Sequence, residues 1–224
     1  MAAELYGQRR AAVHRRTPIS SAAACAAGNG PTIAAVADAR RLKIAFIGTH
    51  GVGKTTLCYG LAARLKARDV VLEIVHEVAR RCPLPINRET GLASQSWILH
   101  TQLAEELVAS ARYPVVLCDR SVLDNYVYLL LAAGRQPALE TLVDSWMTTY
   151  ELLVMVPVTG APSPDGLRAT DPEFQRAVAD RVERELDRRG LPALRLGSDD
   201  RETWLDQVER EALARLAPPQ LPLL

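Results

Sequence analysis

The 224-residue chain has no uninterrupted apolar stretch near the ~20 residues that a membrane-spanning helix needs. It also has little net charge, +1 at pH 7, and aromatic residues make up only 5% of it. A protein that binds nucleic acid over a broad surface carries a clear excess of basic residues. These absences predict that the chain is neither a membrane protein nor a nucleic-acid-binding module.

Cysteine is scarce, and the four cysteines form no C-x-x-C pair: Cys25, Cys58, Cys82 and Cys118. Such spacing favours reduced thiols over disulfides or a zinc site. We therefore expect a cytoplasmic protein.

Acidic residues are nearly absent from positions 1–40, where Glu4 and Asp38 are the only two. The same stretch is rich in alanine and arginine. A targeting signal is the weaker interpretation, because serines interrupt the run of alanines that would form its apolar region. We expect a disordered leader over 1–40, one folded domain over 41–218 and a tail over 219–224.

The segment Gly48-Thr49-His50-Gly51-Val52-Gly53-Lys54-Thr55 matches the Walker A (P-loop) pattern G-x-x-x-x-G-K-[ST] at every position. Glycines let the backbone turn tightly, so that its N–H groups converge on an anion at the start of a helix. Lys54 adds positive charge at the β- and γ-phosphates, and the Thr55 hydroxyl is a ligand for Mg²⁺. The predicted nucleotide-binding residues are His50, Gly51, Val52, Gly53, Lys54, Thr55 and Thr56.

Regular elements flank this loop. The apolar run 42–47 is typical of a buried strand, and the leucines at 57, 61 and 65 form one face of a helix. Further apolar runs predict four more strands, at 70–75, 115–118, 152–156 and 193–196. Helical stretches separate these runs. We predict an α/β fold, a three-layer P-loop NTPase with a mostly parallel five-stranded sheet and helices on both faces.

Two acids follow predicted strands, and ligands of open α/β sheets bind beyond the carboxyl ends of the strands. Asp119 lies where a Walker B carboxylate helps to hold Mg²⁺. Glu77 could accept or orient the proton of an acceptor hydroxyl. For each acid, the alternative is a cap on the helix that follows.

Prolines and glycines over 157–170 predict a mobile lid, whose Arg168 could close on the phosphates. Arg176 is a second candidate, or a solvated residue. In an acceptor pocket Trp97 could stack on a base, unless it belongs to the core. Other candidates that could hydrogen-bond an acceptor are Gln102, Tyr126 and Tyr128.

This set of motifs resembles the P-loop nucleoside and nucleotide kinases. Asp119-Arg120-Ser121 is similar to the D/E-R-S motif of deoxynucleoside kinases, and Glu77-Val78-Ala79-Arg80 is similar to their E-x-x-R segment. Among these kinases, the chain is most similar to the group of AAA-type ATPases that includes the ribosylnicotinamide kinase domain of the NadR type. That group has a D-G-x-R segment like Asp165–Arg168. The resemblance covers roughly residues 43–216.

The resemblance implies a kinase that transfers the γ-phosphoryl group of ATP to a nucleoside- or nucleotide-like small molecule, with Mg²⁺. No N-K-x-D segment, which small GTPases use for guanine, is present, and this leans toward ATP. The alternative is a regulatory NTPase or switch with a protein partner. Whether the chain forms a homo-oligomer stays open. Combined with the motifs, the resemblance gives catalytic roles to Lys54, Glu77, Asp119, Arg120 and Arg168, metal binding to Thr55 and Asp119, and acceptor contacts to Arg80, Trp97, Gln102 and Tyr126.

Overall fold

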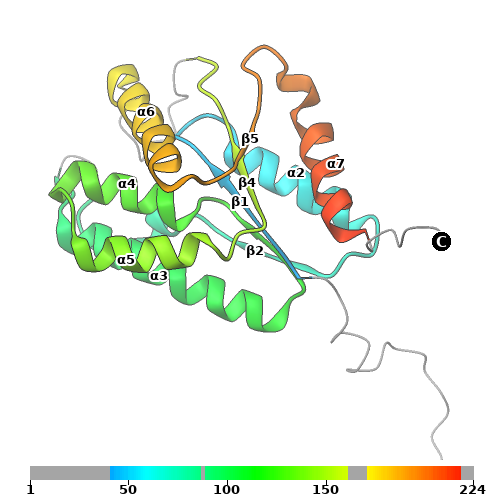
Figure 1. Cartoon of the computed structure of the whole chain (residues 1–224), viewed down its shortest axis with the longest axis horizontal. Coiled ribbons are helices and arrows are strands. Elements are labelled where there is room, and N and C mark those ends of the chain that lie inside the picture. Colours follow the sequence, from blue (N-terminus) through cyan, green and yellow to red (C-terminus); the bar gives the residue numbers. More distant parts are fainter. Residues whose placement is uncertain (1–40, 87–88, 161–170, 218–224) are drawn as a thin grey trace, which may run out of the picture.

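The computed structural model describes residues 41–86, 89–160 and 171–217 (Figure 1). The predicted leader (1–40) and tail (219–224) lie outside these residues, and so does Arg168 in the predicted lid. None of the described helices is both long and apolar enough to cross a membrane. The described cysteines, Cys58, Cys82 and Cys118, are free thiols.

Five parallel strands form one sheet in the order β2-β3-β1-β4-β5. The predicted five-stranded sheet is therefore confirmed. Because β1 lies at its centre, the loop that follows β1 is flanked by the carboxyl ends of β3 and β4. The strands are β1 (Leu42–Ile47), β2 (Leu72–Val75), β3 (Val115–Cys118), β4 (Leu152–Met155) and β5 (Leu194–Arg195).

Helices cover both faces of the sheet, as predicted. Figure 1 shows α2 and α7 on one side, and α3, α4, α5 and α6 on the other. The helices are α2 (Lys54–Lys66), α3 (Leu92–Arg112), α4 (Val122–Ala133), α5 (Pro137–Met147), α6 (Pro172–Arg189) and α7 (Trp204–Leu216), with short 3₁₀ helices η1 (Val78–Arg81) and η3 (Arg201–Thr203).

The central strand β1 is apolar on both faces because both faces are covered. Ile44 and Phe46 belong to the core cluster shared with α2 and α7, whereas Ala45 and Ile47 belong to the cluster shared with α3 to α6. Side chains of a strand alternate between its two faces, and a parallel strand between two helical layers therefore contains few polar residues. The strand holds the P-loop on a rigid support.

The spacing of Leu92, Leu99, Leu103 and Leu107 predicts one apolar face on α3, and this prediction is only partly right. Leu99 and Leu103 are buried, but Leu107 is 58% exposed. Residues four apart drift by about 40° around a helix, so Leu107 lies well to the side of Leu99. Polar side chains share the buried face instead, among them Gln102 and Glu106.

Candidate active site

The P-loop turns between the end of β1 and the start of α2. Its glycines Gly48, Gly51 and Gly53 have φ angles of 132°, 72° and 96°. Residues with a Cβ rarely adopt such angles, whereas glycine adopts them without strain. The spacing of the glycines in the motif therefore follows from the backbone path.

We expect Gly48→Ala to lower the free energy of unfolding by about 1–3 kcal/mol, measured by chemical denaturation. A Cβ on Gly48 would lie 2.7 Å from the backbone oxygen of Val156, so the loop or the end of β4 must move. Gly134→Ala is the control, because Gly134 also has a positive φ (74°) but no atom lies within 4 Å of its Cβ position. Equal losses in the two variants would contradict the predicted clash.

Lys54, at the start of α2, lies along the inside of the loop. Its Nζ donates hydrogen bonds to the backbone oxygen of Gly48 (3.0 Å) and to that of Thr49. Burial, and then the nearby Arg120, lower the pKa of Lys54 to about 7. The phosphates of a bound nucleotide would give this ammonium group a strongly anionic partner in place of the backbone oxygens.

We expect the affinity for MgATP to fall as the pH rises above 7. The free protein loses the Lys54 proton near pH 7, whereas the bound phosphates favour the protonated form, so binding takes up a proton. Linkage then limits the fall in affinity to about tenfold per pH unit. Calorimetric Kd values between pH 7 and 9 test this. Lys54→Met should bind more weakly and with a flatter pH dependence; equal slopes in the two proteins would contradict the assignment to Lys54.

Thr55 and Asp119 meet at the carboxyl edge of the sheet. The Thr55 hydroxyl donates to Asp119 Oδ2 at 2.7 Å, and the Asp119 N–H donates to the backbone oxygen of Val75 at 2.9 Å. Hydroxyl and carboxylate oxygens suit Mg²⁺, which also keeps waters and phosphate oxygens as ligands. No group of three or more His, Cys, Asp or Glu side chains in the described parts of the chain could hold a metal. The Thr55–Asp119 pair fits a Mg²⁺ ion shared with a nucleotide.

A buried ion pair lies beside Asp119. Glu77, which follows β2 and is 6% exposed, accepts a hydrogen bond from Arg120 Nε at 2.7 Å and one from Arg80 Nε at 2.9 Å. Burial opposes the charge of Arg120, but the Glu77 carboxylate outweighs it and raises the pKa of the guanidinium. The two arginines fix the direction of the carboxylate.

Arg120 has an unusual backbone and an incompletely paired side chain. Its φ of 117° is rare for any residue with a Cβ. The guanidinium lies over the ring of Tyr128, 5.2 Å from the ring centroid. Its Nη1 is buried and has no hydrogen-bond partner among the described residues. Since a buried donor without a partner is costly, this N–H is available to an oxygen of a ligand.

Asp124, near the start of α4, supports the P-loop, and the motifs did not identify it. Its Oδ1 accepts a hydrogen bond from the Gly48 N–H at 2.8 Å. Its Oδ2 accepts hydrogen bonds from the N–H (2.9 Å) and the hydroxyl (2.7 Å) of Ser121. The S-x-x-D spacing is a visible helix-capping pattern. The bond to Gly48 joins residues far apart in sequence and has no such local signal.

The start of α6 also contacts the P-loop. Gln175 Nε2 donates to the backbone oxygen of His50 at 3.0 Å, and the Phe174 ring lies 6.0 Å from the His50 ring. The Tyr128 hydroxyl lies 3.1 Å from His50 Nδ1, so this tyrosine is beside the loop. Arg176 is exposed, in line with the solvated interpretation.

No sequence pattern marks Arg201, which η3 brings to the P-loop. Its Nη2 lies 3.4 Å from the position that a Cβ on Gly53 would occupy. Its guanidinium carbon is 5.9 Å from the centroid of the Trp204 ring. Arg201 therefore adds a cation beside the start of α2.

The predicted acceptor residues lie in different surroundings, and two of them, Arg80 and Gln102, bind the Glu77–Arg120 pair. Gln102 is fully buried, and its Nε2 donates to the backbone oxygen of Arg120 at 3.2 Å. Trp97 is half-buried on α3. Tyr126 is fully buried in the core with its ring near Arg189, 5.7 Å from the guanidinium carbon. That arginine lies roughly 20 Å farther along α6 than Gln175. The contact of Tyr126 with an acceptor stays a prediction.

A family model described as an AAA domain matches residues 43–203, more than half of the chain. A search of curated proteins finds no match.

Solved structures share the fold. NadR protein in complex with NAD and AMP-PNP superposes with a TM-score of 0.63 and 16% identity, over 82% of this chain and 52% of NadR. The chain thus spans about half of the length of NadR. Deoxyadenosine kinase from M. mycoides with bound dATP gives a TM-score of 0.54 and 18% identity, over 77% of this chain and all of the kinase (100%). At these identities the likeness establishes the fold. The chain belongs to the AAA domain family and has a P-loop fold like that of the nucleoside kinases.

Proposed function

We propose that this protein is a Mg²⁺-dependent kinase that transfers the γ-phosphoryl group of ATP to a nucleoside- or nucleotide-like acceptor. One observation carries the proposal: the buried Glu77–Arg120 pair lies at the same edge of the sheet as the P-loop. A carboxylate oriented there can accept the proton of an attacking hydroxyl or orient that hydroxyl. A kinase needs one for its acceptor hydroxyl.

In this proposal the chain's own groups position the reactants and stabilise charge. The loop N–H groups and Lys54 bind the phosphates, and Thr55 with Asp119 would hold Mg²⁺. The ion would neutralise charge on the β- and γ-oxygens. Phosphoryl transfer depends mainly on such positioning and electrostatics.

Glu77 would orient the acceptor. The bonds from Arg80 and Arg120 fix the direction of its carboxylate, which would accept or orient the proton of an acceptor hydroxyl. The unpaired Nη1 of Arg120 could donate to the acceptor or to the moving phosphoryl group. Arg201, and Arg168 of the lid, would add positive charge near the phosphates.

The structural neighbours support the choice of reactants. NadR protein has been solved with AMP-PNP and with NR, and the M. mycoides kinase with dATP. ATP and a nucleoside-like acceptor are therefore the first reactants to test.

An ADP-release assay with ATP and Mg²⁺ tests the proposal against a panel of nucleosides, nucleoside monophosphates and nicotinamide riboside. We expect one acceptor class to raise turnover far above the rate with ATP alone. If every acceptor leaves the rate at background, the kinase proposal is wrong. A regulatory NTPase with a protein partner would then be the better account.

A further inference from the structure

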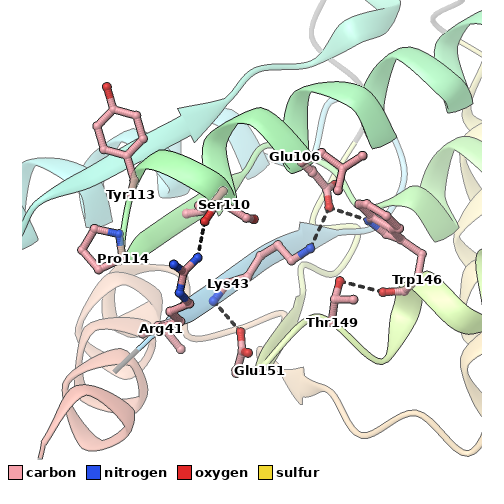
Figure 2. A pocket seen from close by; sticks show the side chains of 12 residues that line it. Arg41, Lys43, Glu106, Ser110, Tyr113, Pro114, Trp146, Thr149 and Glu151 are labelled. Atoms are coloured by element: carbon pink, nitrogen blue, oxygen red, sulfur yellow. Dashed lines mark hydrogen bonds and ion pairs between the residues drawn. The ribbon is translucent and has the colours of Figure 1, made fainter. Parts of the chain in front are cut away.

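Another buried carboxylate lies on α3, toward the opposite edge of the sheet. Glu106 is fully buried and binds four donors. Its Oε2 accepts from Lys43 Nζ (3.2 Å) and Trp146 Nε1 (2.8 Å), and its Oε1 accepts from the Tyr150 hydroxyl (2.6 Å) and Gln102 Nε2 (2.9 Å). Figure 2 shows Glu106, Lys43 and Trp146 in the wall of a cavity of about 260 Å³.

Two of these four donors also bind the turn that follows β3. Gln102 Nε2 donates to the backbone oxygen of Arg120 at 3.2 Å. The Tyr150 hydroxyl accepts from the backbone N–H of Val122 at 3.0 Å. These backbone groups lie on either side of Ser121. The Glu106 carboxylate therefore connects, through two side chains, to both ends of one short turn.

This turn has a reason to need support. Arg120 has the rare φ of 117°, and strained backbone persists only where its surroundings hold it in place. The same turn directs Asp119 to Thr55 and Arg120 to Glu77. A small relaxation at Arg120 would move both contacts together.

We propose that Glu106 is a positioning residue of the active site: through Gln102 and Tyr150 it holds the Asp119-Arg120-Ser121 turn in its catalytic geometry. The inference rests on the proposed kinase function for its effect on rate. Burying a carboxylate is costly unless it is paired, and apolar side chains would often be as stable in its place. A role in holding the turn accounts for a charge at this depth.

The four donors provide a matched pair of variants. Tyr150→Phe and Trp146→Phe each remove one hydrogen bond to Glu106, but only Tyr150 is bonded to the turn. We expect Tyr150→Phe to lower kcat by about tenfold to a hundredfold, with KM for ATP nearly unchanged, because the reacting groups are misplaced. Trp146→Phe should keep kcat near the wild-type value, even if its Tm falls as much as the Tm of Tyr150→Phe. If both variants lose kcat in the same proportion to their loss of Tm, Glu106 has only a structural role.

A second readout needs no activity. The Arg120 Nε–H signal in ¹H–¹⁵N spectra, assigned by its loss in Arg120→Lys, reports the bond to Glu77. We expect it to shift and to exchange faster with water in Tyr150→Phe, but not in Trp146→Phe. Equal behaviour in the two variants would overturn the inference. Because no acceptor is present, this result stands even if the wild type proves to phosphorylate nothing.

If Tyr150→Phe does not fold, Val122→Pro tests the same contact. It removes the same hydrogen bond from the backbone side, at the first residue of α4, where proline is tolerated. Ser121 before it already has the extended backbone that a following proline requires (φ −99°, ψ 168°). The Arg120 Nε–H signal should again shift and exchange faster, and an unchanged signal would contradict the role of the turn.

Discussion

Lys54→Ala is expected to lower phosphoryl transfer by at least about 100-fold and to leave the protein folded. The ammonium group lies inside the P-loop, bonded to the loop's own carbonyl groups until a phosphate takes their place. Its lowered pKa, about 7, shows that burial disfavours the charged form. Removing the ammonium therefore removes a cost to the folded state, and Tm should not fall. Initial rates and thermal unfolding of the same preparation measure both effects.

Lys66→Ala is the matched control for this variant. Lys66 is in the last turn of the same helix, α2, and is exposed. Lys66→Ala also shortens a lysine of α2 to alanine but does not touch the loop, so its rate should stay near that of the wild type. Wild-type turnover in Lys54→Ala would contradict the catalytic role of Lys54 and of the P-loop.

Glu77→Gln is expected to lower acceptor phosphorylation by about 10²–10⁴-fold while ATP still binds. Glutamine keeps the shape of the side chain but loses its charge and one acceptor oxygen. It can no longer bind Arg120 and Arg80 and also take the proton of an acceptor hydroxyl. Rates with the acceptor found for the wild type, together with the Kd for MgATP, separate the two effects.

Glu185→Gln controls for the loss of a buried ion pair. Glu185 is also buried, and it pairs with the buried side chain of Arg189, away from the P-loop. Losing one partner of a buried pair costs about 3–5 kcal/mol, so both variants should be destabilised. Only Glu77→Gln should lose acceptor phosphorylation. Equal rate losses would show that stability, rather than a role at the acceptor, explains the effect of Glu77.

The sheet and the approach of Asp119 to the P-loop were predictable because their signals are local. β1, the P-loop and α2 are contiguous in sequence, and the apolar runs of the buried strands contain few polar residues. Asp119 directly follows such a strand, and parallel strands bring their carboxyl ends to one edge. Its contact with Thr55, which is 64 residues away in sequence, follows from that topology.

The supporting contacts were not predictable, because they join residues far apart in sequence. Glu106 lies on a helix whose leucine spacing suggested an apolar face, and its partners come from β1 and from the region of α5. Arg201 reaches the P-loop from the end of the domain. Tyr126 follows the D-R-S motif closely, but the motif does not determine which side of α4 its ring occupies.

The most direct test of the kinase proposal follows the γ-phosphoryl group of labelled ATP to its product. With Mg²⁺ and the best acceptor of the panel, the account predicts that the label appears on the acceptor in the wild type and is nearly absent from it in Glu77→Gln. Label that appears only in inorganic phosphate, at a rate that no acceptor changes, would contradict the account and identify the protein as an NTPase.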